Sequence, residues 1–207
     1  IALCFYAPPY QTLYSQTNVF WLGQTPGRPQ PLLPQGEIAA AGSLPAAANA
    51  EYTALSRFEE NRAYAGNLPD GTADEDHFFC QAVLFGGKSV SFQVVCSQVK
   101  SAQPGKVRAM LRSYSPTSPS SHLKLLVNGA VAGEFRWDRA TRFLAEADVP
   151  AGVLVEGTNT VTLTSFGDTK AALEATYTDW VEIAYRRPLL AMNGAVKFTA
   201  DLSGPAR

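Results

Sequence analysis

The stretch from residue 123 to residue 163 constrains the fold of this chain more than any other. Residues 123–127 form a short alternating segment that runs into Asn128-Gly129, a dipeptide that favours positive φ and therefore a tight hairpin turn. A return segment, 131–137, follows. Leu-x-x-Gly-x-Asn at 154–159 then leads into the β-branched, alternating segment 160–164. This order of strands, turn and glycine-asparagine loop predicts a jelly-roll sandwich.

Most of the chain after residue 77 consists of similar short segments separated by turn residues. Residues 89–99 show the clearest two-residue period, with Val90, Phe92, Val94 and Cys96 on one side and mostly polar residues on the other. About ten or eleven such strands indicate two packed sheets. We expect strands at 1–6, 17–22, 77–85, 89–99, 105–113, 123–128, 131–137, 143–149, 159–166, 178–186 and 195–200.

The predicted fold class is therefore all-β, a two-sheet jelly-roll sandwich of the galactose-binding-like type that spans 1–207 as a single domain. Residues 23–76 interrupt the domain near its N-terminus as a long, largely irregular, proline-rich insertion, because prolines cannot enter a central strand. Within this insertion, 50–63 is either one or two helical turns or an edge strand, and the pattern leaves both open.

The composition excludes several classes of function. A net charge of −1 provides no field to hold nucleic acid or an acidic membrane surface. No run approaches the roughly 18 apolar residues of a membrane span. Hydrophobic residues make up 46% of the 207 and charged residues 17%, so a folded core is expected rather than disorder. The chain opens in mid-strand at 1–6, and we expect it to be a fragment of a larger protein.

The cysteines do not have the spacing of a metal site. Cys4 is isolated, and Cys80 and Cys96 lie sixteen residues apart, so the chain contains no Cys-x-x-Cys pair. If 78–85 and 90–97 form a hairpin, the last two sulfurs come close together. A Cys80–Cys96 disulfide is one outcome, and two free buried thiols are the simpler one.

Four motifs occur in order along the chain. They are FYAPPYQTLYSQTNVFWL at 5–22, RFEENRAYAGNLPDG with DEDHFF at 57–79, HLKLLVNG with GEFRW and LVEGTNTVTL at 122–163, and YTDWVEIAYRRPLLAMNGAVKF at 177–198. Together they resemble the non-catalytic region of secreted bacterial proteins that carry gingipain-like cysteine peptidase domains. The resemblance implies a β-sandwich upstream of the peptidase domain in the same polypeptide. The chain departs from the family pattern at Phe78-Phe79, where Trp-Phe or Trp-Tyr is usual.

One nucleophile-and-base pair is worth weighing, His77 with Cys80. Residues three apart on a strand point to opposite faces, so this pair is poorly placed for a dyad, which needs an exposed thiol beside the imidazole. In the simpler interpretation His77 is a strand-entry residue, Cys80 is a core residue and His122 is a solvated turn residue. We therefore expect no enzymatic activity in this fragment.

An acidic loop is the best candidate metal site. Asp70, Asp74 and Asp76 lie in one polar stretch, and calcium takes about six to eight oxygen ligands, often from such a loop. The spacing is not that of an EF-hand, and a solvated loop without metal is the alternative. A structural calcium is the sharper hypothesis, and no other cofactor is expected.

Three tryptophans are candidate sugar contacts. Trp180 and Glu182 share one side of the strand 178–186, Trp137 precedes an aspartate, and Trp21 lies on an alternating strand. Exposed aromatic rings stack on pyranose faces while carboxylates bond the hydroxyls. The alternative is that these rings pack between the sheets, as large aromatics mostly do.

The resemblance implies a non-catalytic accessory or interaction domain of a secreted or cell-surface bacterial gingipain-like peptidase protein. Its partner would be the peptidase domain of the same polypeptide. One alternative is a carbohydrate-binding module with a glycan or cell-surface ligand of its own. Another is a self-assembling extracellular structural subunit, which would form homo-oligomers. Partners of the nucleic-acid class and a membrane span are not expected.

Overall fold

The computed structural model describes residues 51–68, 76–81 and 83–190, and every regular element within them is a β-strand. The all-β prediction is therefore confirmed. The strands expected at 1–6, 17–22 and 195–200 lie outside the described residues. Among those described, no helix is long and apolar enough to cross a membrane. The strands are β1 (Glu51–Glu59), β2 (Ala63–Tyr64), β3 (Phe78–Phe79), β4 (Leu84–Phe85), β5 (Ser89–Cys96), β6 (Gly105–Ser113), β7 (Ser121–Val127), β8 (Ala130–Trp137), β9 (Arg142–Val149), β10 (Gly157–Ser165) and β11 (Ala175–Pro188).

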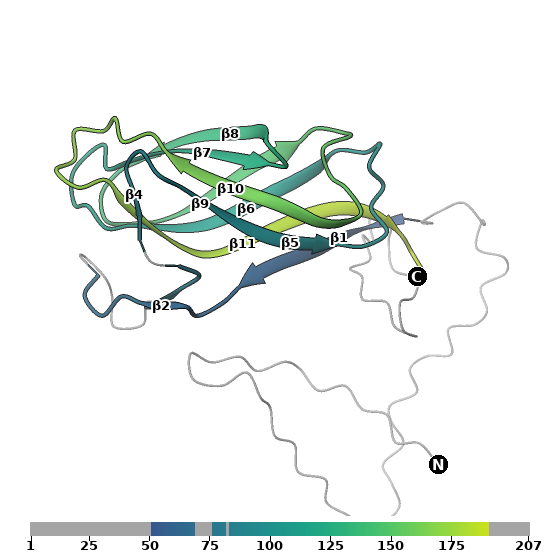
Figure 1. The fold of residues 1–207 in the computed structure, drawn as a ribbon, viewed down its shortest axis with the longest axis horizontal. Coiled ribbons are helices and arrows are strands. Elements are labelled where there is room, and N and C mark those ends of the chain that lie inside the picture. The colour runs from purple at the N-terminus through teal and green to yellow at the C-terminus, as the bar shows by residue number, and fades with distance from the viewer. Residues whose placement is uncertain (1–50, 69–75, 82, 191–207) are drawn as a thin grey trace, which may run out of the picture. The chain divides into compact units, whose positions relative to one another are not determined.

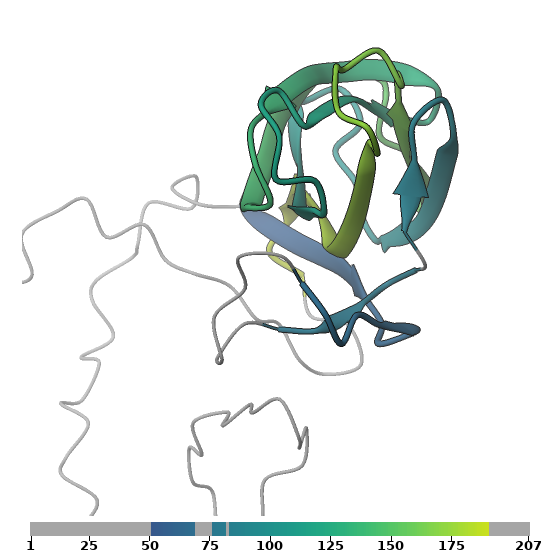
Figure 2. The same cartoon turned by 90° about the vertical axis from the view of Figure 1, so that its left-hand side faces the viewer.

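Two antiparallel sheets form the predicted sandwich (Figure 1). One sheet has the order β1-β11-β6-β9, with β4 paired to the start of β11, and the other has the order β5-β10-β7-β8. β2 and β3 form a separate short ribbon. Figure 2 looks along the strands and shows the two sheets wrapped around a shared interior.

Alternation along the strands builds the core between the sheets. Val161 and Leu163 of β10 are fully buried, whereas Thr162 between them lies on the outer face. Leu111 of β6 and Ile183 of β11 meet them from the other sheet. Burying each such side chain stabilises the fold by roughly 1.5–3 kcal/mol.

Aromatic pairs close the two open sides of the sandwich. Phe58 of β1 meets Phe92 of β5 with ring centroids 5.5 Å apart, and Trp137 of β8 stacks on Phe143 of β9 at 4.8 Å. Both pairs join an edge strand of one sheet to an edge strand of the other. The large rings therefore fill the space where strand pairing stops.

The hairpin predicted at Asn128-Gly129 is confirmed. It connects β7 to β8, and its two residues have φ values of 49° and 85°. Both values lie in the left-handed region that asparagine and glycine adopt most readily. Local turn chemistry therefore decides this connection.

One expectation about the middle of the chain is wrong, because 77–85 is not one continuous strand. The hairpin that the sequence left open does not form, since β4 pairs with β11 and β5 pairs with β10. The expected insertion at 23–76 includes β1 and β2. β1 is the edge strand left open by the sequence, because it pairs along its whole length with the long β11. Residues 23–50 lie outside the described residues.

The chain enters β1 and leaves β11 at the same end of the sandwich, where Glu51 pairs with Pro188. We call the opposite end the distal end. It carries the turn 86–88 and the loops 114–120 and 166–174, which follow strands running toward it.

Candidate functional site

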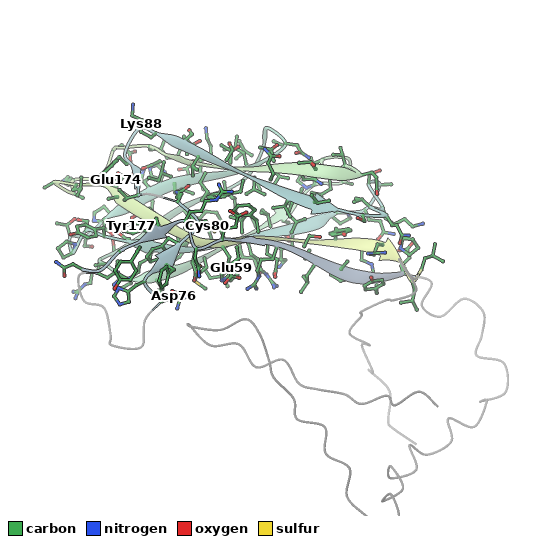
Figure 3. All side chains as sticks on the ribbon, turned by 60° about the horizontal axis from the view of Figure 1, so that its bottom comes forward. Glu59, Asp76, Cys80, Lys88, Glu174 and Tyr177 are labelled. Atoms are coloured by element: carbon green, nitrogen blue, oxygen red, sulfur yellow. The ribbon has the colours of Figure 1, made fainter. Side chains whose placement is uncertain are left out.

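A pocket of about 420 Å³ opens at the distal end, and we call it the distal pocket. Its volume lies within the roughly 300–1,000 Å³ of typical small-molecule sites. Figure 3 shows two residues at this end, Tyr177 in the pocket wall and Glu174 beside it, away from the C-terminal end of β11. The side chains that shape the pocket are those of Tyr64, Asn67, Phe85, Tyr114, Leu173 and Tyr177.

Ring stacking holds the tyrosines of the pocket. Tyr177, near the start of β11, stacks on the buried Phe79 with centroids 4.6 Å apart and meets Tyr114 edge-on at 6.5 Å. Tyr64 of β2 lies 5.1 Å from Phe78 of β3. Burial raises the pKa of Tyr177, so its hydroxyl stays a neutral donor and acceptor.

The lining of the pocket combines apolar side chains with the hydroxyl groups of three tyrosines and the amide of Asn67. Tyr64, Phe85 and Leu173 are 66%, 47% and 44% exposed, so three large apolar side chains are grouped around the hollow. None of its lining residues is charged. In the part of the chain that the structure describes, the hydroxyls of Tyr64, Tyr114 and Tyr177 have no hydrogen-bond partner. The pocket thus offers ring faces and unused hydroxyls to an uncharged ligand.

The tryptophans singled out from the sequence do not reach this pocket. Trp137 is buried, as the packing alternative required, because it closes one side of the sandwich. Trp180 lies on the outer face of β11, but the Arg57 guanidinium carbon sits 4.1 Å from its ring centroid. Glu182 is 4% exposed and ion-paired to Arg57 and Arg108. Trp21 lies outside the described residues.

The acidic loop is only partly described. Asp76 accepts a hydrogen bond from the backbone N–H of Phe78, a local cap that needs no metal. Asp70 and Asp74 lie outside the described residues. Within residues 51–68, 76–81 and 83–190, no group of three or more His, Cys, Asp or Glu could hold a metal ion. The structural calcium stays a prediction.

Cys80 and Cys96 are free, buried thiols. The two sulfurs do not meet, because Cys80 lies against β11 and Cys96 ends β5 in the other sheet. Cys80 Sγ donates to the backbone carbonyl of Asp179 at 2.7 Å, and desolvation raises the pKa of both thiols to about 11. His77 instead bonds the backbone carbonyl of Ala65 through Nδ1. The structure does not bring together the dyad weighed from the sequence.

His122 is not the solvated turn residue that we expected. It lies on β7 with 3% of its side chain exposed, and both ring nitrogens bond carboxylates. Sequence pattern failed here because β7 begins two residues earlier than expected, at Ser121, and because Phe166 covers the ring from a distant loop.

Sequence reasoning missed most of the pocket. Tyr64 was only one aromatic among many, and Tyr114 and Tyr177 carry no local mark of exposure. They meet because β2, the 114–120 loop and the start of β11 converge at the distal end. The only local signal was the clustering of tyrosines and phenylalanines near strand ends.

No protein-family model matches this sequence, and no curated protein matches it. Among solved structures, latent dimeric PorU from Porphyromonas gingivalis matches 67% of this chain at 12% identity and a TM-score of 0.48. The chain spans only 13% of that PorU chain. A CBM36 carbohydrate-binding module in complex with calcium and xylotriose matches 61% of this chain and 98% of its own at 14% identity and a TM-score of 0.38. CBM35 from Cellvibrio japonicus Abf62 matches 66% and 96% at 16% identity and a TM-score of 0.38. At these identities the likeness is one of fold alone.

Proposed function

We propose that this domain is a non-catalytic binding module that holds a neutral sugar in the distal pocket. The lining of the pocket carries the proposal: three tyrosines with unused hydroxyls, an asparagine and no charged side chain. Pyranose rings present apolar C–H faces to aromatic rings and hydroxyls to polar groups, which is the chemistry this lining matches. A phosphate or a cation finds no charged partner there.

The module would serve as an accessory domain of a larger secreted or cell-surface bacterial protein of the gingipain-like type. The four sequence motifs that resemble those of gingipain-like proteins support this assignment. β1 begins and β11 ends at the end of the sandwich opposite the distal pocket. The reading frame beyond Arg207 tests the context. An α/β domain with a His and Cys pair is expected there, and a different enzyme would contradict the assignment.

The binding role is tested by calorimetric titration of the complete 207-residue chain with four neutral sugars: xylotriose, cellotriose, mannotriose and galactotriose. We expect one of these neutral trisaccharides to bind with a dissociation constant of roughly 10 μM to 1 mM, as suits a shallow open site. Binding of an apolar peptide in place of every sugar would contradict the proposal. Thiol-dependent proteolysis by the chain alone would contradict the non-catalytic role.

A further inference from the structure

A buried histidine lies at the distal end of the sandwich, near the start of β7. His122 lies on the outer face of β7, its inward neighbours being Ser121 and Leu123. Phe166 covers the imidazole with ring centroids 3.9 Å apart and planes 12° from parallel. Phe166 begins the loop 166–174, so the stack joins a rigid strand to that loop.

Two carboxylates face the two nitrogens of this ring. Nε2 lies 2.7 Å from Oε1 of Glu134 on β8, and Nδ1 lies 2.7 Å from Oδ1 of Asp168 in the loop. Arg136 of β8 bonds the other oxygen of Asp168 at 3.1 Å, and Lys124 of β7 lies 5.5 Å from the Phe166 ring centroid. The hydrogen bond from His122, with a smaller contribution from Arg136, lowers the pKa of Asp168. An imidazole can donate to both carboxylates only when it is protonated.

The same loop forms part of the pocket wall. Leu173 lines the pocket, and the next residue, Glu174, is buried and bonds Ser165 and the backbone N–H groups of Gly167 and Thr169. The backbone of the loop also touches the turn before β5, since a Cβ on Gly167 would meet the Gly87 nitrogen at 2.8 Å. The first residues of the loop thus contact His122, and Leu173 near its end lines the distal pocket.

We propose that His122 is a pH-dependent clamp on loop 166–174 and, through this loop, on the distal pocket. The second half of this proposal rests on the sugar-binding role above. Protonated His122 makes charge-assisted bonds to Glu134 and Asp168 and a cation–π contact with Phe166. The neutral ring has one N–H and one lone pair, so it releases one carboxylate, bonds the other less strongly and loses the cation–π contact. The loop therefore loosens as the pH rises.

Nuclear magnetic resonance separates the clamp from sugar binding. Histidine is in general the side chain whose charge changes between pH 5 and pH 8, and this chain has only one other, His77. We expect the amide signals of Gly167 and Thr169 to follow the imidazole titration of His122. In His122→Gln these shifts should disappear, and in the control His77→Gln they should remain.

Trisaccharide affinity, measured on the complete chain from pH 5 to pH 8 with the four sugars named above, gives the second readout. We expect the wild type to lose roughly threefold to tenfold in affinity toward pH 8, and His122→Gln to lose this dependence. Asp168→Asn, at a carboxylate whose side chain is 48% exposed, should show a reduced dependence. If the amides titrate but no sugar binds, the clamp stands and the sugar role fails. If they do not titrate with His122, or if His122→Gln keeps the full pH dependence of affinity, the clamp is wrong.

Discussion

The side-chain amide of Asn128 donates a hydrogen bond to Oδ1 of Asn159 over 2.8 Å, so the β7–β8 hairpin turn is tied to the loop that precedes β10. Asn159 is fully buried, and its Oδ1 also accepts from the Val155 N–H while its Nδ2 donates to the carbonyls of Val155 and Gly157. The asparagine of the Leu-x-x-Gly-x-Asn motif therefore satisfies the backbone of its own loop. It is a structural residue and not a ligand contact.

Asn159→Ala should lower the free energy of unfolding by about 2–4 kcal/mol, because it leaves buried donors and acceptors unpaired. Urea unfolding of the complete chain measures this loss. Thr158→Ala changes the exposed neighbour and should stay within about 0.5 kcal/mol. Equal effects from the two changes would contradict the role of Asn159.

Tyr64→Ala should weaken trisaccharide binding by roughly tenfold or more, because it removes the most exposed ring face of the distal pocket. Its effect on stability should be small, since the side chain is mostly solvated. Leu55→Ala removes a similarly exposed apolar side chain from β1 and should leave the affinity unchanged. Calorimetric titration compares the two variants, and equal affinities would argue against the pocket.

Asp179 makes stability depend on pH in a predictable direction. It lies at a bulge of β11 and bonds Arg142 at 2.7 Å, yet desolvation outweighs this partner and raises its pKa to about 6. Because the folded pKa exceeds the unfolded one, the native state binds the proton more tightly. Stability therefore falls as the pH rises from about 4 to about 6, by on the order of 2–3 kcal/mol.

Asp179→Asn should remove this fall, so that its free energy of unfolding changes less between pH 4 and pH 6 than that of the wild type. Urea unfolding at several pH values provides the comparison. Asp148→Asn, at a carboxylate whose side chain is 87% exposed, should keep the wild-type slope. An unchanged slope in Asp179→Asn would show that Asp179 does not carry the effect.

The two buried thiols should resist alkylation in the native protein, because burial and a pKa of about 11 leave almost no thiolate at pH 8. In a Cys4→Ser variant, which retains only Cys80 and Cys96, we expect no rapid reaction with Ellman's reagent under native conditions. Both thiols should react after unfolding without reductant. A disulfide would instead leave none to react in either state.

β5 is an edge strand among the described residues, and its sequence, SVSFQVVC, contains no charge and no proline. Uncharged edges of this kind promote strand addition. We expect self-association at high concentration by light scattering, and Val95→Lys should reduce it. Val131→Lys, at an exposed valine on the opposite edge strand β8, should not. A wild type that stays monomeric would remove this support for a self-assembling subunit.

Local pattern predicted those parts of the fold that depend on neighbours in the chain. The inward faces of β5 and β10 follow from their two-residue period, and the Asn128-Gly129 turn follows from φ preferences. The pairing of β4 with β11, rather than with β5, could not be predicted in this way, because it depends on a partner some ninety residues away. The disulfide alternative failed for the same reason.

The sequence by itself determined that the chain forms short strands with one apolar face, because side-chain alternation and turn preferences act over a few residues. Only the tertiary structure decided which aromatic rings meet water. Trp137 looks like a sugar contact in the sequence but closes the sandwich against β9, whereas Tyr64 looks ordinary and is exposed over the distal pocket. Alternation sets the side of a strand on which a residue lies, and long-range packing sets what covers that side.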